Sequence, residues 1–367
     1  MHLFTGLLTT GLAALALASA AQTPKPRTEN VVLVTLDGMR WQEVFGGADS
    51  ALFRQSKHYY ADRKALQKDF GQGTPEQRRQ TLLPFLWGTV VRQGQLYGNR
   101  NAGSLVNVTN TMRFSYPGYN ELLTGAADDA RIRSNDPLDN PNASVLEVLN
   151  GQPAFRGRVA AFGSWEAFPY ILNEKRSGLP VNAGQRLAPG PGLTPGEQLL
   201  NQLEVATPSP FGEERLDALT YGFALEHLKK KKPRVLYLSF GDTDDFAHAG
   251  EYGAYLHAAQ YTDTFLRQLW EYLQADPQYR GKTTLLVTTD HGRGVAGTQW
   301  QTHGRDVAGA DQIWLAALGP DTPATGMATT GQLYQNQVAA TLARLLGQAY
   351  APTPATGKPI GPVVGSK

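Results

Sequence analysis

The sequence contains no cysteine, and this absence removes several kinds of chemistry at once. A chain without thiols forms no disulfide, holds no metal ion through thiolates and offers no cysteine nucleophile. It also lacks the cysteine that a lipoprotein needs for its lipid anchor. Any metal site must therefore be built from histidine, aspartate and glutamate side chains, and the 367 residues include only seven histidines.

The chain also has no strong excess of charge of either sign. Its 34 lysines and arginines nearly balance its 32 acidic residues, which leaves a formal net charge of +2. This balance gives no indication of binding to a nucleic-acid polymer. The only dense basic run, Lys229 to Lys232, follows a helical pattern and is interpreted as a solvated helix end. A hydrophobic content of 41% indicates a folded globular protein.

A pure apolar run occurs only at the N-terminus. It extends from Leu3 to about Leu17 and ends in Ala18-Ser19-Ala20, which is a cleavage pattern of small residues. We expect residues 1–20 to be a secretory signal peptide that is cleaved after Ala20, and 21–29 to be a linker. The mature protein would then be periplasmic or secreted and have no membrane span. An uncleaved anchor is the alternative, although the run is short for a bilayer.

Apolar runs typical of buried strands alternate with helical patterns along the rest of the chain. The strand-like runs are 31–36, 157–163, 234–241, 283–292 and 312–319. The helical patterns are 82–94, 143–151, 214–230, 252–274 and 331–347. This alternation predicts a three-layer α/β/α sandwich with a mostly parallel central sheet, formed by one domain over residues 30–350.

Three segments do not follow this alternation. Residues 46–80 are polar and charged, and residues 174–213 are rich in proline, glycine, asparagine and glutamine. We interpret both as excursions from the sheet that could form a small cap beside an active site. Residues 351–367 have the composition of a flexible tail.

Acidic and histidine side chains recur where three of the predicted strands end. In a parallel sheet, the carboxyl ends of the strands line the crevice that binds ligands. Asp244 and His248 are four residues apart, so one helical turn places both on one face. Oxygen and imidazole ligands without thiolates suit zinc, with manganese or iron as alternatives, and two such ions about 4 Å apart promote displacement at phosphorus. The residues concerned are Asp37, Asp242, Asp244, His248, Asp290, His291 and His303.

A candidate nucleophile lies in the segment NVTNTMRFSYPGYNELLTG, residues 107–125. This segment turns through Ser115 and Pro117 into a short helical pattern. A serine at a helix N-terminus is commonly only an N-cap. The same position also stabilises negative charge, so Ser115 could attack a phosphoryl group there, with a bound metal ion activating its hydroxyl.

Taken in order, the motifs TLDGMRW, SYPGYNELLTG, DTDDFAH, TTDHG and THG resemble those of the alkaline phosphatase superfamily of two-metal phosphate- and sulfate-ester enzymes. The nearest resemblance is to its nucleotide pyrophosphatase/phosphodiesterase branch, and it extends from about Val31 to Gly347. It implies that Ser115 forms a phosphoserine intermediate. It also implies two metal sites, one formed by Asp37, Ser115, Asp290 and His291 and the other by Asp244, His248 and His303.

The same resemblance suggests residues around these ligands. Asn135, in RSNDP, falls about where the branch has an asparagine that contacts the phosphoryl oxygens. Arg40 is a candidate phosphate contact because it lies next to a motif, and Arg305 is a candidate for the same reason or for support of the ligands. Asp242 is a candidate for supporting Asp244 or for replacing it as a ligand.

The resemblance implies an exported phosphodiesterase or phosphatase that acts on small-molecule phosphate esters with two divalent ions, zinc before manganese. The branch usually has threonine where this chain has Ser115, and the phosphatase and phosphoglycerate mutase branches use serine. The alternatives are a mutase-like phosphotransferase, a headgroup transferase and a non-catalytic metal-binding protein. A sulfatase is disfavoured because Tyr119 stands where sulfatases have the arginine required to form formylglycine.

Overall fold

The computed structural model describes residues 26–55, 62–212, 214–295 and 297–365. The expected signal peptide, residues 1–20, lies outside the described residues. None of the helices within these ranges combines the length and the apolar character that a membrane-spanning segment needs.

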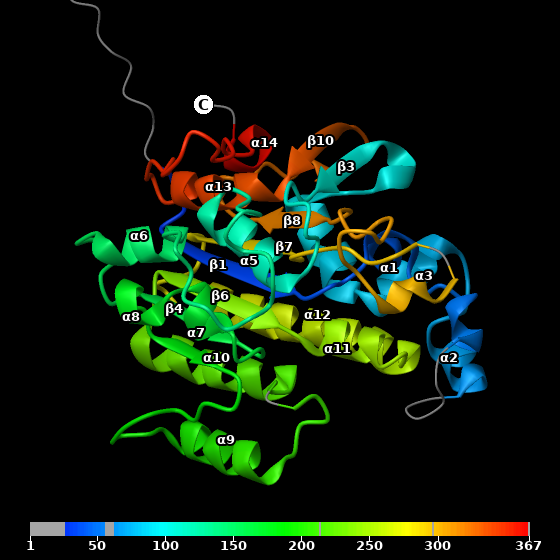
Figure 1. Ribbon diagram of the computed structural model, residues 1–367, viewed down its shortest axis with the longest axis horizontal. Coiled ribbons are helices and arrows are strands. Elements are labelled where there is room, and N and C mark those ends of the chain that lie inside the picture. Colours follow the sequence, from blue (N-terminus) through cyan, green and yellow to red (C-terminus); the bar gives the residue numbers. More distant parts are fainter. Residues whose placement is uncertain (1–25, 56–61, 213, 296, 366–367) are drawn as a thin grey trace, which may run out of the picture.

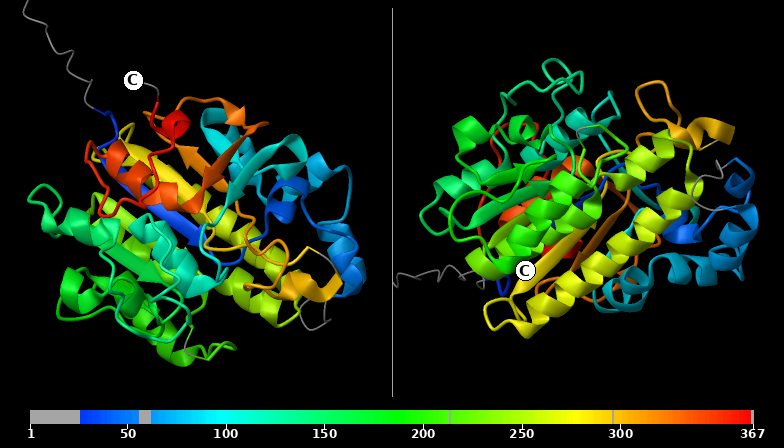
Figure 2. Two further views of the ribbon diagram at one scale, coloured as in Figure 1. Left: turned by 45° about the horizontal axis from the view of Figure 1, so that its top comes forward. Right: turned by 90° about the horizontal axis from the view of Figure 1, so that it is seen from below.

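An eight-stranded sheet forms the centre of the fold, with the strand order β5-β4-β6-β1-β7-β8-β2-β9 (Figures 1 and 2). The strands from β5 to β7 in this order are parallel, and β8 is antiparallel to both of its neighbours. A second sheet pairs β3 with β10. The strands are β1 (Asn30–Leu36), β2 (Gln95–Tyr97), β3 (Ser104–Asn107), β4 (Val159–Gly163), β5 (Val181–Ala183), β6 (Val235–Phe240), β7 (Thr283–Thr288), β8 (Leu315–Leu318), β9 (Gly326–Met327) and β10 (Gly331–Tyr334).

Helices cover both faces of the large sheet, which confirms the predicted three-layer α/β/α arrangement. One face packs against α5 (Ser115–Thr124), α6 (Val145–Gly151) and α13 (Val338–Leu345). The other face packs against α10 (Asp217–Lys231) and α12 (Tyr252–Ala275). The remaining helices are α1 (Trp41–Gly46), α2 (Arg63–Asp69), α3 (Pro75–Leu82), α4 (Val91–Gln93), α7 (Phe168–Ile171), α8 (Glu174–Ser177), α9 (Pro195–Ala206), α11 (Asp242–His248) and α14 (Gly361–Val364).

The central strand β1 contributes to both hydrophobic cores. Val31 and Leu33 pack on the side of α5 and α13, whereas Val32, Val34 and Leu36 pack on the side of α10 and α12. Successive side chains point to opposite faces of a strand, so a strand buried on both faces must be apolar throughout. This explains why the run in β1 shows no polar alternation.

The C-terminal segment differs from the flexible tail that its composition suggested. Ile360 and Val363 are buried, and α14 belongs to the core beside α13. The backbone nitrogen of Ile360 donates a hydrogen bond to Thr341 Oγ1, and the carbonyl of Val363 accepts one from Thr322 Oγ1. The prediction is therefore wrong for residues 360–364, whereas residues 351–359 are largely exposed and belong to no helix or strand.

Three other segments also differ in detail. The excursion 174–213 includes β5, an edge strand of the large sheet. The helix expected over 82–94 extends from 84 to 93; it is separated from α3 at Leu83, and its central turn, Leu86–Val90, is a π-helix. The helix expected over 331–347 begins only at Val338, because Gly331–Tyr334 form β10 against β3.

Candidate active site

Three neighbouring strands of the large sheet end side by side. Leu36 of β1 is paired with Phe240 of β6, and Thr35 of β1 is paired with Thr288 of β7. The backbone nitrogen of Asp37 donates to the carbonyl of Phe240, which continues the pairing by one residue. The segments after these strands therefore meet at one place, as the sequence motifs predicted.

Asp37, Asp290 and His291 form one cluster, which we call the buried group. All three side chains are buried. His291 Nε2 lies 3.3 Å from Asp37 Oδ1 and 3.3 Å from Asp290 Oδ2. One ligand atom from each residue lies within 4.8 Å of the others, so the buried group could hold a single metal ion.

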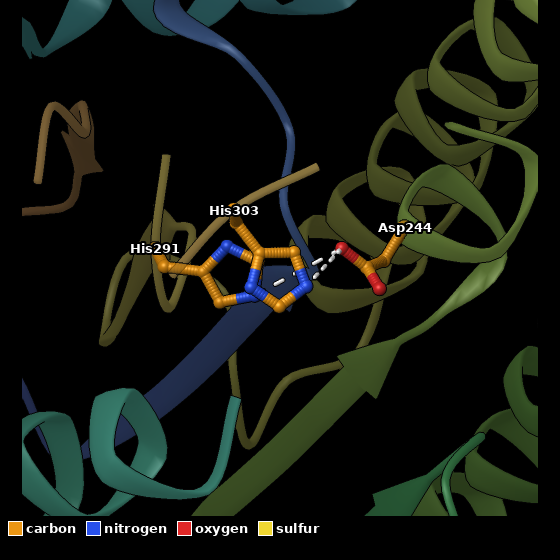
Figure 3. A group of neighbouring side chains, drawn as sticks. All are labelled: Asp244, His291 and His303. Atoms are coloured by element: carbon orange, nitrogen blue, oxygen red, sulfur yellow. Dashed lines mark ion pairs between the residues drawn. The ribbon is translucent and has the colours of Figure 1, made fainter. Parts of the chain in front are cut away.

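Asp244, His248 and His303 form a second cluster, which we call the half-exposed group. His248 Nε2 lies 2.9 Å from His303 Nε2 and 3.1 Å from Asp244 Oδ2, and its side chain is 45% exposed. The two groups adjoin each other through His291. Its ring stacks on that of His303 with 3.9 Å between the centroids, and its Nε2 lies 3.8 Å from Asp244 Oδ1 (Figure 3).

Several ligand atoms in these groups have no hydrogen-bond partner. Asp37 Oδ1, Asp290 Oδ2 and His303 Nδ1 are buried atoms of this kind. A buried carboxylate oxygen without a donor costs free energy unless a cation compensates it. The donors are oxygen and imidazole nitrogen atoms, which divalent ions such as zinc accept. The residues present therefore fit divalent metal ions.

Burial and neighbouring charges shift the pKa values of the carboxyl groups in the two clusters in opposite directions. Burial, followed by the charge of Asp244, raises the pKa of Asp37 well above its usual value. Burial and the charge of Asp37 likewise raise the pKa of Asp290. Burial also opposes ionisation of Asp244, but the charges of Arg293 and His303 hold its pKa well below the usual range. Without a bound cation, ionisation is thus disfavoured in the buried group and favoured at Asp244.

Ser115 is the first residue of α5 and lies against the buried group. Its Oγ is 3.3 Å from His291 Nε2, and its side chain is buried. The close approach depends on Gly118, because a Cβ atom at that position would lie 2.5 Å from the carbonyl oxygen of Asp290. The positive end of the α5 dipole therefore faces the cluster, where it favours an anion.

Asn135 and Tyr119 also lie at this end of α5. Asn135 Oδ1 accepts a hydrogen bond of 3.0 Å from the backbone nitrogen of Tyr116, which follows Ser115. The hydroxyl of Tyr119 donates to Asp37 Oδ2 at 2.8 Å. The sequence predicted a place for Asn135 near the nucleophile, but gave no role to Tyr119.

Of the two arginines that the sequence suggested as phosphate contacts, one lies in the core and the other lies at the surface near Ser115. Arg40 is buried, and its Nε lies 3.1 Å from Glu43 Oε2. Arg305 is exposed; its Nη2 lies 3.1 Å from Met112 Sδ, and its carbonyl oxygen accepts a hydrogen bond from Arg113 Nη1. Proximity to a motif in sequence thus misplaced Arg40, whose guanidinium belongs to an ion pair in the core. Arg305 lies beside the loop that precedes Ser115.

Asp242 has a structural contact that excludes it as a replacement for Asp244. Its carboxylate accepts hydrogen bonds from the backbone nitrogen of Asp217 and from the hydroxyl of Tyr261. In return, the Asp217 carboxylate accepts from the backbone nitrogens of Gly241 and Asp242 at 2.7 and 3.1 Å. The two aspartates therefore cap each other's helix N-termini, α10 and α11, and Asp242 supports Asp244 only by fixing the start of α11.

One charged residue at the site was not identified from the sequence. Arg293 lies two residues after His291 and is buried, and its Nη1 donates to Asp244 Oδ1. The only signal in the sequence is its place in the run DHGRG, two residues after the predicted ligand His291. A buried arginine next to a proposed ligand requires an explanation of its own.

The sequence matches the model of one protein family, the type I phosphodiesterase / nucleotide pyrophosphatase family, over residues 48–296. This range includes Ser115, Asp244, His248, Asp290 and His291, and it excludes Asp37 and His303. No curated protein matches the sequence.

Solved structures share the fold at low sequence identity. The alkaline phosphatase PafA is 12% identical, with a TM-score of 0.58, and the match covers 94% of this chain and all of that one. The lipoteichoic acid synthase LtaP from Listeria monocytogenes is 13% identical with a TM-score of 0.56, over 90% of this chain and 74% of that one. The phosphonate monoester hydrolase SpPMH from Silicibacter pomeroyi is 14% identical with a TM-score of 0.53, over 92% and 76%.

Proposed function

The chain belongs to the type I phosphodiesterase / nucleotide pyrophosphatase family of hydrolytic enzymes, and on this basis we propose that it hydrolyses small-molecule phosphate esters through a phosphoserine on Ser115. The buried group, together with Ser115, would hold one divalent ion, and the half-exposed group would hold the other. Zinc suits the imidazole and carboxylate donors best, with manganese as the alternative. When bound, the two ions would stabilise negative charge on the phosphoryl oxygens and on the attacking and leaving oxygens.

Two successive displacements at phosphorus follow from the position of Ser115. In the first, Ser115 Oγ bonds to phosphorus, the bond from phosphorus to the leaving oxygen breaks, and the alcohol departs with a proton. In the second, a water oxygen bonds to phosphorus, the bond to Ser115 Oγ breaks and the serine hydroxyl is restored. The N-terminus of α5 favours the anionic phosphoryl group, and Asn135 Nδ2 could donate to one of its oxygens.

A single observation carries this proposal. A buried serine hydroxyl lies 3.3 Å from His291 Nε2, at the N-terminus of a helix and against a cluster of buried carboxylates. A serine that served only as a helix cap would need none of these neighbours, and Ser115 is the first helical residue rather than the N-cap, which is Phe114. The arrangement therefore supports covalent phosphoryl transfer over a purely structural serine.

The test is hydrolysis of three chromogenic substrates by the zinc-loaded protein: a phosphate diester, a phosphate monoester and a sulfate ester, each with and without chelator. We expect chelator-sensitive turnover of a phosphate ester, and the ratio of diester to monoester turnover then assigns the enzyme as phosphodiesterase or phosphatase. Mass spectrometry of rapidly quenched enzyme should find phosphate on Ser115. Ser115→Ala should lose both signals, whereas Ser144→Ala, which removes the side-chain cap of α6, should keep them.

Absence of turnover in protein that retains its metal would contradict the proposal. That result would favour a mutase-like phosphotransferase, a headgroup transferase or a metal-binding protein without catalysis. Turnover that survives in Ser115→Ala would retain the hydrolase but remove the phosphoserine.

The place of action and the role of the two excursions belong to the same proposal. Residues 1–20 would direct export, and N-terminal sequencing of the secreted or periplasmic protein should begin at Ala21. Residues 46–80 and 174–213 would shape the substrate pocket as a cap. Shortening either excursion should then change the ratio of diester to monoester turnover without removing the metal ions.

A further inference from the structure

We propose that Arg293 is the positioning residue of the half-exposed group, holding Asp244 and His303 in place for the divalent ion. This inference rests on the proposed function, because it concerns how one of the two ions is bound. It would make Arg293 a determinant of metal affinity at one group and leave the other group unaffected.

Arg293 uses all three nitrogens of its guanidinium. Nη1 donates to Asp244 Oδ1, Nε donates to the carbonyl oxygen of Trp300 at 2.8 Å, and Nη2 donates to that of Gln301 at 2.8 Å. The side chain is completely buried. A planar guanidinium held at three points has a fixed orientation, so it can fix the groups that it contacts.

These three contacts join the segments that carry the ligands. Asp244 lies on α11, whereas Trp300 and Gln301 end the short helical turn η4 (Gly297–Gln301), two residues before His303. Without such a connection, His303 would depend on a loop for its position. Arg293 thus ties the loop of one ligand to the carboxylate of another. It lies five residues after the end of β7, in the segment that carries Asp290 and His291, so it also ties both to that segment.

The contact also fixes how the Asp244 carboxylate is oriented between the two histidines of the group. Oδ1 is engaged by Arg293 and lies 3.7 Å from His303 Nε2, while Oδ2 lies 3.1 Å from His248 Nε2. A residue that holds one carboxylate oxygen orients the other, which is how residues behind a metal ligand commonly tune affinity.

The backbone provides the space for this pair. Gly38 has φ of +57°, and a Cβ atom there would lie 2.5 Å from Asp244 Oδ1 and 2.6 Å from Arg293 Nη1. Any other residue after Asp37 would therefore collide with the pair. Lysine at position 293 could reach Asp244 but could not also bond both carbonyl oxygens in the same plane.

The buried group is supported by different donors. Asp37 Oδ2 accepts from the hydroxyl of Tyr119 at 2.8 Å, and Asp290 Oδ1 accepts from the backbone nitrogen of Gly38 at 3.1 Å. Among the described residues, Arg293 makes no hydrogen bond or ion pair with these carboxylates, although its positive charge also favours ionisation of Asp37. Loss of its side chain should therefore weaken one ion and largely spare the other, which a general loss of stability would not do.

The experiment measures zinc bound per chain at buffered free zinc concentrations, together with thermal midpoints, for full-length protein. The variants are Arg293→Met, Arg293→Lys and, as a control, Arg267→Met, which removes an exposed arginine paired with Glu271 on α12. We expect Arg293→Met to weaken the weaker of two zinc-binding steps about 10- to 100-fold and to leave the stronger step unchanged. Arg293→Lys should recover part of the loss, and Arg267→Met should match the wild type.

Two outcomes would overturn the inference while the proposed function survives. One is that Arg293→Met binds zinc in two steps with the same affinities as the wild type. The other is a parallel loss of both steps together with the thermal midpoint, which would make Arg293 a general structural residue. If Arg293→Met does not fold, an unchanged weak step in Arg293→Lys has the same meaning. A wild-type protein that binds no zinc or manganese would instead remove the proposed function, and this inference with it.

Discussion

The buried group and the half-exposed group use the same types of side chain but are compensated differently. The carboxylates of Asp37 and Asp290 receive hydrogen bonds from neutral donors, and each retains an unpartnered oxygen. Asp244 instead receives the charge of Arg293, and His248 in the same group is open to solvent. In the buried group, the missing positive charge must come from outside the chain. The buried carboxylates are thus left without a compensating charge unless a cation binds, whereas Asp244 is already paired with Arg293.

The largest effect should separate the two groups in catalysis. Asp290→Asn removes a ligand where no water can replace it, so we expect kcat/KM to fall on the order of 10^4-fold. His248→Ala opens a position that water can fill, and we expect a loss nearer 10^2-fold. Steady-state kinetics with the preferred chromogenic substrate, at saturating zinc, measures both. Equal losses would contradict the distinction between the groups.

Metal removal should show the same order. With increasing chelator, the half-exposed group should release its ion first, because its site is open to solvent. Zinc analysis after gel filtration should therefore give two steps separated by about tenfold or more in chelator concentration. In His248→Ala, the first step should disappear and the second should remain. A single cooperative loss of both ions in the wild type would contradict the expected difference between the two groups.

In metal-free protein, replacing a carboxylate of the buried group should stabilise the fold instead of destabilising it. Asp290→Asn relieves the repulsion between two buried carboxylates, so we expect it to raise the free energy of unfolding of chelated protein by about 2 kcal/mol. His248→Ala changes a half-exposed side chain and should stay within about 0.5 kcal/mol of the wild type. Denaturant titrations with chelator present measure both. Destabilisation by Asp290→Asn would show that the carboxylates are compensated within the chain.

The smallest expected effect is the dependence of folding stability on pH, which has opposite signs for Asp290 and Asp244. The folded-state pKa of Asp290 is raised, so the folded protein holds a proton that the unfolded chain releases above about 3.8, and stability falls as pH rises from there. The folded-state pKa of Asp244 is lowered, so its contribution is present above about 3.8 and is lost as pH falls below it. Each difference of one proton changes stability by about 1.4 kcal/mol per pH unit.

Chelated wild type, Asp290→Asn and Asp244→Asn provide the test. The advantage of Asp290→Asn over the wild type should grow between pH 4 and pH 7. The deficit of Asp244→Asn should shrink toward zero as pH is lowered below about 4. Parallel pH profiles for the three proteins would show that the two carboxylates do not differ in this way.

The sequence was sufficient where several weak signals coincide. Every residue of β1, β6 and β7 is buried because both faces of the sheet are covered, each strand contains a run of apolar residues, and each is followed by a ligand candidate. The spacing of Asp244 and His248 correctly predicted one face of α11. These features depend on local periodicity and on the rule that parallel strands end together, so they can be read from residue order alone.

Other features depend on contacts between distant segments and leave no local pattern. The short strands β2, β5 and β9 have two or three residues each, too few to show a period. The pairing of Asp217 with Asp242 and the contacts of Arg293 become visible only when the chain is folded. The position of Arg40 was likewise not predictable, because a charged residue next to a motif can pair with a buried residue such as Glu43 as readily as it can face the site.

The 174–213 segment contains β5, and this position at the edge of the sheet affects which sequence changes the fold can accept. The ligands depend on β6, β1 and β7 in the middle of the sheet, whereas β5 is its outermost strand on one side. Insertions and deletions at that margin are tolerated because few partners must move with them. Changes at that margin would leave the proposed ligands in place, so under the proposed function they could alter which leaving groups are accepted without altering how the ions are held.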